Sequence, residues 1–309
     1  MDFTIITPVY NGEKYIRETI DSIINCAEGI NAEIIVINDG STDQTQKILE
    51  NYGTQILLLN QVNAGEANAV NKGISSASGR FSLVVSADDP LLSEELFARA
   101  LKIFNENPSC VVVYPDWQMI DENGEVLLEK ECEEFSFKKM LGEFNCIPGP
   151  GAVFSTTVAK KIHGRNPEYR FTSDYDFWLR MALHGDFIRI PSILAQWRQH
   201  PESTSIGQRG FSMAAERIAV IENYLNLYPQ TKELSRQAMA SAYYNAAILS
   251  FFNPAIPGRK WLLQGFYLRK GWITGSRMRI VVYILLSPIS RYLYQILKTL
   301  GITNKLRHK

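Results

Sequence analysis

The sequence predicts an α/β fold, in which a mostly parallel sheet with helices on both faces is followed by an all-helical C-terminal region. Through residues 1–120, short and nearly continuous apolar runs alternate with segments of helical spacing. Such runs are typical of parallel strands that are buried on both faces, because the connecting helices cover the sheet. From about Phe211 onward the pattern is wholly helical.

The expected strands are apolar runs that end at polar or turn-forming residues. The first covers 3–6 and stops at Thr7-Pro8, and the second covers 33–37 and stops at Asn38-Asp39-Gly40. Gly and Asp favour turns, so the second stop is a strand boundary. The remaining expected strands are 55–59, 81–85, 110–114 and 187–190.

The expected helices are recognised by apolar residues that recur at helical spacing. Within 15–24 these are Ile16, Ile20, Ile23 and Ile24. Ser41-Thr42-Asp43 is a typical N-cap for a helix that runs through Leu49. Further helices are expected over 66–77, 94–105, 174–183, 213–227, 232–252, 259–270 and 279–300.

The change of pattern near residue 210 predicts the domain organisation. We expect a domain over 1–210, with a first half over 1–120 and a second half over 121–210, and a helical region over 211–309. The segment 281–286 is strongly apolar, but Pro288, Ser290 and Arg291 interrupt it. It falls short of the roughly 20 apolar residues that span a bilayer. An interfacial helix and a buried core helix are both compatible with it.

The charge is distributed unevenly although the formal net charge is zero. Residues 1–233 hold all 32 acids and 20 Lys+Arg, and residues 234–309 hold 12 Lys+Arg and no acid. A basic, apolar tail predicts an anionic partner, and membrane lipid is favoured because no nucleic-acid recognition module is present. The four cysteines show no CxxC spacing and the N-terminus begins directly on a strand. We therefore expect reduced thiols and a cytoplasmic protein, with the tail peripheral on the inner face of the cytoplasmic membrane.

Two adjacent acids, Asp88 and Asp89, follow the apolar run 81–85. Ligands of open α/β sheets bind beyond the carboxyl ends of the strands. Neighbouring carboxylates repel each other unless a cation or a donor group offsets their charge. The pair therefore predicts a bound metal ion with an anionic group on its other side.

Six motifs occur here in the order seen in family 2 glycosyltransferases of the GT-A fold, which the chain resembles over about its first two thirds. Each motif is short, but each falls at a fitting element end. They are Thr7-Pro8-Val9-Tyr10-Asn11-Gly12, Asn38-Asp39-Gly40-Ser41-Thr42-Asp43, Asn71-Lys72-Gly73, Ser86-Ala87-Asp88-Asp89, 173–180 (SDYDFWLR) and Trp197-Arg198-Gln199-His200.

The resemblance implies a nucleotide-sugar donor, with a UDP-sugar favoured. Tyr10 can offer an aromatic face to a base, and Asp39 can accept a hydrogen bond from a base N–H. Asn71-Lys72-Gly73 either contacts the nucleotide or only closes a helix. The implied nucleotide-binding residues are Pro8, Tyr10, Asn11, Asp39, Lys72 and Asp88.

The resemblance also implies a divalent cation, Mn²⁺ or Mg²⁺, held by Asp88, Asp89 and His200. Oxygen ligands suit these ions, which also bridge phosphate oxygens. The family often has Asp-x-Asp here, whereas this chain has Ser86-Ala87-Asp88. Which of the two acids contacts the metal is therefore left open, as is the ribose contact of the missing acid.

Asp174 is implied as the general base that removes a proton from the acceptor hydroxyl, so that a single displacement inverts the anomeric configuration. The family usually has Glu-Asp where this chain has Ser173-Asp174. The donor-sugar and acceptor side is expected to include Gly149, Pro150, Gly151, Trp178 and Arg198. Arg198 is alternatively a phosphate contact or a structural partner.

The predicted function is metal-dependent, inverting transfer of a hexosyl or N-acetylhexosaminyl group to a hydroxyl of a glycan or lipid-linked glycan, in polysaccharide or lipopolysaccharide synthesis. One alternative is a sugar-phosphate nucleotidyltransferase, but 9–13 (VYNGE) is not a Gly-rich, basic triphosphate loop. The other is a nucleotide-sugar-binding protein that has lost catalysis, which Ser86 and Ser173 would favour.

Overall fold

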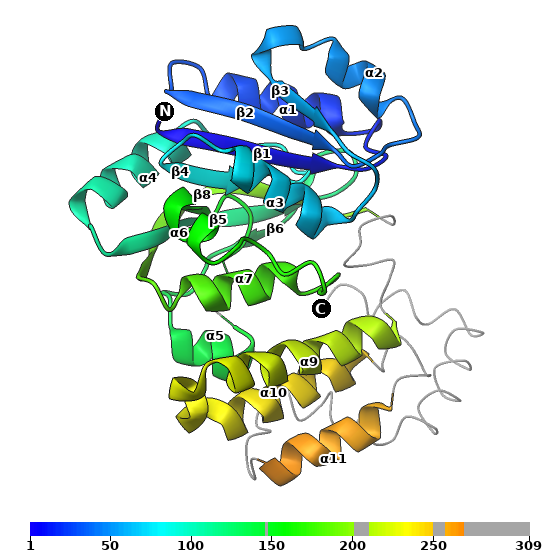
Figure 1. The fold of residues 1–309 in the computed structure, drawn as a ribbon, viewed down its shortest axis with the longest axis vertical. Helices are drawn as coiled ribbons and strands as arrows, with labels where there is room; N and C mark the ends of the chain where they lie inside the picture. Colours follow the sequence, from blue (N-terminus) through cyan, green and yellow to red (C-terminus); the bar gives the residue numbers. More distant parts are fainter. Residues whose placement is uncertain (146–147, 201–209, 250–256, 269–309) are drawn as a thin grey trace. The chain divides into compact units, whose positions relative to one another are not determined.

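The computed structural model describes residues 1–145, 148–200, 210–249 and 257–268. The chain divides into two compact units, one of residues 1–141 and 145–207 and the other of residues 142–144 and 208–309. The first unit contains an eight-stranded, mostly parallel sheet with helices between its strands (Figure 1). The strands are β1 (Phe3–Val9), β2 (Ala32–Asn38), β3 (Leu57–Asn60), β4 (Phe81–Val84), β5 (Cys110–Ile120), β6 (Val126–Lys130), β7 (Val153–Ser155) and β8 (Asp186–Arg198).

The helices of the first unit lie between these strands in the chain. The α-helices are α1 (Ile16–Cys26), α2 (Thr45–Glu50), α3 (Glu66–Ser76), α4 (Glu95–Glu106), α5 (Phe137–Glu143), α6 (Thr156–Lys161) and α7 (Ser173–Met181). A short 3₁₀ helix, η1 (Gly53–Gln55), precedes β3. The predicted mostly parallel sheet with interleaved helices is confirmed, whereas the sequence pattern missed β6, β7, α5 and α6.

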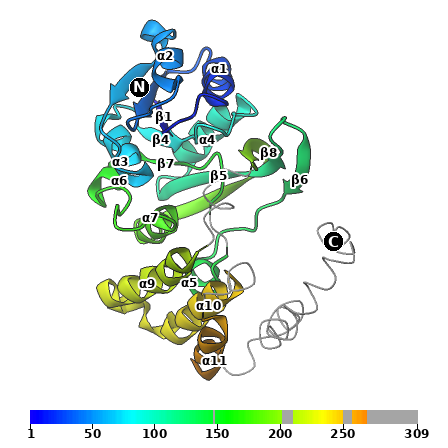
Figure 2. The same cartoon turned by 90° about the vertical axis from the view of Figure 1, so that its right-hand side faces the viewer.

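The strand order is β3-β2-β1-β4-β7-β5-β6, and β8 pairs with β5 off this path. β3, β2, β1 and β4 are mutually parallel, and β7 and β6 pair antiparallel with their neighbours. β8 runs parallel to β5 (Figure 2). The second half of the unit is thus attached to β4 through β7, which brings the end of β8 toward the end of β4.

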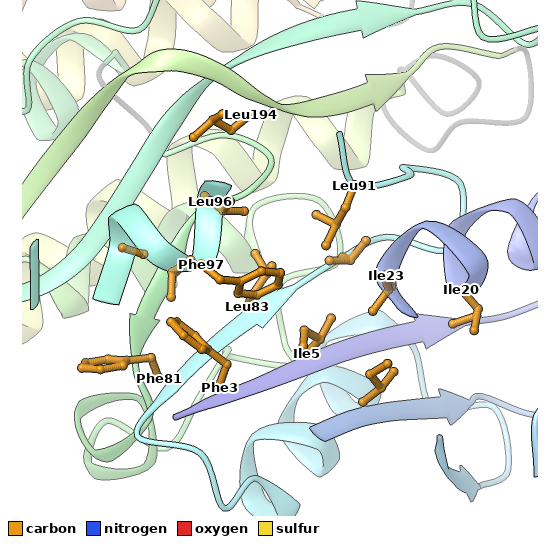
Figure 3. Close-up of a cluster of buried hydrophobic side chains, with 14 of the residues drawn as sticks. Phe3, Ile5, Ile20, Ile23, Phe81, Leu83, Leu91, Leu96, Phe97 and Leu194 are labelled. Atoms are coloured by element: carbon orange, nitrogen blue, oxygen red, sulfur yellow. The ribbon is translucent and has the colours of Figure 1, made fainter. Parts of the chain in front are cut away.

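The core between the sheet and one helical layer is built from the apolar runs of the sequence. Side chains of β1 and β4 meet apolar side chains of α1 and α4 (Figure 3). Phe3 contacts Phe97 edge-on, with ring centroids 5.1 Å apart, and Phe81 stacks on Phe104, with ring centroids 3.9 Å apart. Figure 3 labels ten residues of this hydrophobic cluster, namely Phe3, Ile5, Ile20, Ile23, Phe81, Leu83, Leu91, Leu96, Phe97 and Leu194.

Helix α3 covers the opposite side of β1 and β2 through a glycine. A Cβ at Gly73 would lie 2.3 Å from Ile6 Cγ2 and 3.0 Å from Ile37 Cδ1. The helix backbone therefore packs directly on the strands. This close approach accounts for the glycine of the Asn71-Lys72-Gly73 motif in terms of packing.

Replacing Gly73 by alanine is expected to destabilise the protein by about 1–3 kcal/mol, because the added methyl group overpacks this contact. Helix propensity alone predicts the opposite sign, a gain of about 1 kcal/mol. Urea unfolding of Gly73→Ala and of the exposed control Ser76→Ala measures the difference. A stabilised Gly73→Ala protein would contradict the packing account.

The second unit is helical in the residues described. It contains α9 (Phe211–Leu227), the 3₁₀ helix η2 (Pro229–Leu234), α10 (Ser235–Ile248) and α11 (Gly258–Leu268). α10 contacts both α9 and α11. Among the described residues, no helix is long and apolar enough to cross a membrane. The predicted helix over 279–300 and most of the basic tail lie outside the described residues.

Candidate active site

The predicted nucleotide- and metal-binding residues follow the carboxyl ends of adjacent parallel strands. β1 pairs with β2 up to Val9 and Asn38, and with β4 up to Ile6 and Val84. Tyr10 and Asp39 come directly after β1 and β2, and Asp88 follows the end of β4 by four residues. The register therefore brings them to one edge of the sheet, which is where open α/β sheets hold ligands.

Tyr10 is exposed, with 52% of its surface accessible, and its ring is available at the end of β1. Pro8 is buried within β1, so its side chain packs in the interior. Asn11 has a left-handed backbone, with φ of 52°. Its side-chain oxygen accepts a hydrogen bond from Thr42 N at 2.8 Å, and its own N–H donates to Ser41 Oγ at 2.9 Å. Asn11 thus joins the loops after β1 and β2.

Asp39 is buried and organises the loop before α3. Its Oδ1 accepts hydrogen bonds from Gln61 Nε2 at 2.7 Å and Ala64 N at 2.8 Å, and its Oδ2 accepts one from Gly65 N at 2.9 Å. Asp39 is only 3% exposed, so its contact with a base N–H stays a prediction. Lys72 donates to the carbonyl of Asn60 at 2.7 Å, so its ammonium group is held at the end of β3.

Asp88 and His200 form a close pair between the end of β4 and the segment after β8. Asp88 Oδ2 lies 2.8 Å from His200 Nε2. The Asp88 side chain is 29% exposed and that of His200 is 10% exposed. The His200 ring also packs beside Tyr15, with centroids 5.1 Å apart. The two predicted metal ligands are 112 residues apart in sequence, and the structure brings them together.

Asp89, unlike Asp88, is buried and bonded to the backbone of Arg198. It is 8% exposed, and its Oδ1 accepts a hydrogen bond from the backbone N–H of Arg198 at 2.7 Å. Burial, and then the charge of Asp88, raises the pKa of the Asp89 carboxyl well above its ordinary value. This geometry corrects the expectation that Asp89 is a metal ligand, because its carboxyl is engaged inside the protein.

Arg198 is also interior rather than on a ligand-facing surface, which corrects its assignment to the acceptor side. The side chain is 1% exposed. Its Nε donates to the carbonyl of Asp88 at 2.9 Å, and its Nη2 lies 2.7 Å from Glu18 Oε1. The guanidinium also stands 4.8 Å from the centre of the Tyr15 ring. Arg198 therefore ties the end of β8 to the Asp88 turn and to α1.

Asp174 lies in the first turn of α7 and is an exposed residue. Desolvation raises the pKa of its carboxyl, and the charge of Arg165 opposes the shift. Asp176 instead pairs with Arg180 of the same helix, with Oδ2 at 2.6 Å from Nη2. Asp174 is thus an exposed residue, whereas Asp176 is buried in an ion pair.

Trp178 does not face an acceptor. It is 6% exposed and packs against Phe154, Phe177 and Phe187, so its predicted place on the acceptor side is corrected to the core. Its ring meets Phe154 of β7 and Phe187 of β8, so Trp178 packs α7 against the sheet.

The loop that contains Gly149, Pro150 and Gly151 packs on β5 and β8. A Cβ at Gly149 would lie 2.6 Å from Trp117 Nε1, and one at Gly151 would lie 2.6 Å from the Cβ of Ala195. Gly151 also has a left-handed backbone, with φ of 78°. Close backbone approach therefore explains both glycines, whatever the loop binds.

The structure also reveals charged side chains that the sequence pattern did not single out. Glu18 pairs with Arg198, and Glu66 pairs with Arg165. Their partners are 99 residues or more away in sequence. Residues so far apart leave no pattern in the sequence that indicates pairing, so these ion pairs can be recognised only from the structure.

Within the described ranges, no cluster of three His, Cys, Asp or Glu side chains could hold a metal ion alone. Asp88 and His200 nevertheless supply a carboxylate oxygen and an imidazole nitrogen at one point. Mn²⁺ and Mg²⁺ are often bound by one or two protein ligands together with substrate phosphates. The pair therefore fits a cation that is shared with a phosphorylated ligand.

Solved structures share this fold. The structure of residues 1–349 of S. aureus TarS superposes with a TM-score of 0.61 at 18% identity, and covers 86% of this chain and 89% of that one. A mannosyltransferase from Pyrobaculum calidifontis, in complex with GDP-Man and Mn²⁺, gives a TM-score of 0.53 at 17% identity, with 92% and 87% covered. These likenesses define the fold class: the protein has a GT-A-type fold.

Sequence comparison identifies the family within that class. The pattern of Glycosyl transferase family 2 matches residues 4–161, and the chain belongs to this family. An uncharacterised glycosyltransferase of Rickettsia typhi is 32% identical over 197 residues, which is 62% of this chain and 59% of the relative. The match thus spans about three fifths of that relative's length.

Proposed function

We infer that the protein transfers a hexosyl or N-acetylhexosaminyl group from a nucleotide-sugar, with a UDP-sugar favoured, to a hydroxyl of a glycan or lipid-linked glycan. The observation that carries this proposal is the convergence of Tyr10, Asp39 and the Asp88–His200 pair beyond adjacent strand ends. They offer an aromatic face, a base acceptor and a cation site in one row. S. aureus TarS, a neighbour in fold, has been crystallised with UDP-GlcNAc.

A divalent cation completes the donor site in this proposal. Asp88 and His200 would hold it, and the cation would be Mn²⁺ or Mg²⁺, since carboxylate oxygens suit both ions. When bound, the cation would stabilise the negative charge that develops on the leaving nucleoside diphosphate. Arg198 and Asp89 would keep the Asp88 turn and the end of β8 in place.

Asp174 is the proposed general base. Asp174 is an exposed residue in the first turn of α7, where an acceptor hydroxyl could approach it. As a carboxylate it would accept the hydroxyl proton while that oxygen attacks the anomeric carbon. One displacement of this kind inverts the configuration at that carbon. The accessible position of Asp174, compared with the ion-paired Asp176, supports the choice between the two acids.

The basic charge of residues 234–309 supports a proposal for the acceptor substrate and for the place of the protein in the cell. The twelve uncompensated basic residues of 234–309 would be attracted to anionic lipid head groups at the inner face of the cytoplasmic membrane. A lipid-linked glycan would be presented at that surface, which fits a role in polysaccharide or lipopolysaccharide synthesis.

The test is donor turnover. We expect the purified protein to release nucleoside diphosphate from at least one nucleotide-sugar in the presence of Mn²⁺, and to stop when EDTA removes the cation. The donors to compare are UDP- and GDP-linked hexoses and N-acetylhexosamines. Binding of a donor without any release, with or without candidate acceptors, would instead support a nucleotide-sugar-binding protein that has lost catalysis.

A further inference from the structure

The Tyr15 side chain belongs to the start of α1, where hydrogen bonds fix its backbone. The Tyr15 N–H donates to the carbonyl of Gly12 at 3.1 Å, and the Tyr15 carbonyl accepts from Thr19 N at 3.1 Å. Gly12 is held in turn, because its N–H donates to Thr45 Oγ1 at 2.9 Å. The Tyr15 side chain therefore extends from a fixed point.

The His200 ring stands two residues past the end of β8, beyond the residues that pair with β5. The Gln199 N–H still donates to the carbonyl of Ile120, at 2.8 Å. Outside the ladder of the sheet, the orientation of an imidazole depends on the side chains around it. Tyr15 is one of these, with ring centroids 5.1 Å apart and an interplanar angle of 43°.

Four contacts join Tyr15, His200, Asp88 and Arg198 into one closed group. Asp88 Oδ2 lies 2.8 Å from His200 Nε2, and the Asp88 carbonyl accepts from Arg198 Nε at 2.9 Å. The Arg198 guanidinium lies 4.8 Å from the centre of the Tyr15 ring, which also contacts the ring of His200. Guanidinium–aromatic and ring–ring contacts of this kind are attractive. Each member is therefore held by two others.

Burial encloses the members of this group to different degrees. Tyr15 is 7% exposed, and the side chains of Arg198 and His200 are 1% and 10% exposed. The Asp88 side chain is 29% exposed and is the most accessible of the four. Neighbours that orient a metal ligand matter for the metal, since changing them costs about 10- to 100-fold in affinity.

We propose that Tyr15 is a positioning residue, whose ring holds the His200 imidazole with Nε2 at Asp88 Oδ2, so that a divalent cation meets both ligands together. The inference rests on the proposed function, since it takes this pair as the cation site. Tyr15 itself contacts neither the cation nor the nucleotide-sugar in this role. Its ring is required and its hydroxyl is not.

Tyr15→Leu is expected to weaken Mn²⁺ binding by about tenfold, because the His200 ring loses the flat surface that orients it. Tyr15→Phe keeps the ring and should bind Mn²⁺ within about twofold of the wild type. Titration with Mn²⁺ alone, followed by electron paramagnetic resonance, measures both affinities without turnover. Tyr15→Met removes the ring in a second way and replaces Tyr15→Leu if that variant does not fold.

Tyr52→Leu is the matched control, because it removes another buried tyrosine ring. Tyr52 is 8% exposed, and its hydroxyl donates to Asp21 Oδ1 at 2.7 Å. This variant should lose stability in urea unfolding but keep the Mn²⁺ affinity of the wild type. An equal loss of affinity in Tyr52→Leu and Tyr15→Leu would make the effect one of general stability and would overturn the positioning role.

NMR observes the orientation of the His200 ring directly, because the chain has only four histidines. The His200 ring signals are assigned by their loss in His200→Ala. An aromatic ring shifts the signals of protons beside it, so these signals should move in Tyr15→Leu without any metal, and much less in Tyr15→Phe. Added Mn²⁺ should broaden them in the wild type at concentrations that leave them sharp in Tyr15→Leu.

The Mn²⁺ titrations separate this inference from the proposed function. If Tyr15→Leu bound Mn²⁺ as tightly as the wild type while His200→Ala did not, the positioning role would be overturned and the cation site would stand. Equal losses in Tyr15→Phe and Tyr15→Leu would also overturn it, because the hydroxyl would then be the required group. If His200→Ala bound Mn²⁺ like the wild type, or the wild type bound none, the inference and the proposed cation site would both be overturned.

Discussion

Replacing Asp174 by asparagine is expected to lower kcat by about 10²- to 10⁴-fold, which is the usual contribution of a general base. The amide has the same shape but cannot accept the acceptor's proton. Asp174 is exposed and makes no ion pair in the residues described, so the fold should tolerate the change. The measurements are steady-state transfer rates and donor affinity, and the affinity should stay close to that of the wild type.

Asp176→Asn is the matched comparison, because it changes the other acid in the first turn of the same helix. Asp176 is buried and paired with Arg180, so this variant should lose stability rather than catalytic chemistry. If Asp174→Asn retained the wild-type kcat, Asp174 would not be the base. The accessible carboxyl would then need another explanation.

The second large effect concerns the adjacent acids. Asp88→Asn is expected to weaken Mn²⁺ binding by about 100-fold or more, because even changes outside the ligands cost 10- to 100-fold. Turnover should fall with it. Asp89→Asn should bind Mn²⁺ nearly as well as the wild type, since its amide oxygen can still accept the Arg198 N–H. Titration with Mn²⁺, followed by electron paramagnetic resonance, measures both affinities without the need for turnover.

Asp89→Ala tests the structural role of the second acid. It removes the acceptor of a buried N–H and should destabilise the protein by about 1–3 kcal/mol. Urea unfolding measures this loss. If Asp89→Asn abolished Mn²⁺ binding and Asp88→Asn did not, the assignment of the two acids would be reversed.

Much of the first unit could be predicted from the sequence, because its strands are buried on both faces and end at polar residues. The pairing of β1 with β2 and β4 then places Tyr10, Asp39 and Asp88 at one edge of the sheet. The resemblance added His200, and the structure places it 2.8 Å from Asp88. The sequence pattern was sufficient to place those side chains that follow the end of a predicted strand closely.

The remaining features depend on contacts between distant segments. β8 continues to Arg198, well past the apolar run at 187–190, because pairing with β5 and not local composition sustains it. Asp89 and Arg198 are residue types that are common in ligand sites, yet both are buried here. Asp89 accepts a hydrogen bond from the Arg198 backbone N–H, and the Arg198 side chain donates to the carbonyl of Asp88. The Glu66–Arg165 pair likewise joins segments that no sequence spacing connects.

The most direct test of the account is the melting temperature of the protein with nucleoside diphosphates, measured in Mn²⁺ and again in EDTA. Binding to the folded state stabilises it by about 2.7 kcal/mol when the ligand is at 100 times its dissociation constant. We predict that UDP raises the melting temperature by several degrees with Mn²⁺ and much less in EDTA. If no nucleoside diphosphate changed the melting temperature in Mn²⁺, the proposed donor site at these strand ends would be contradicted.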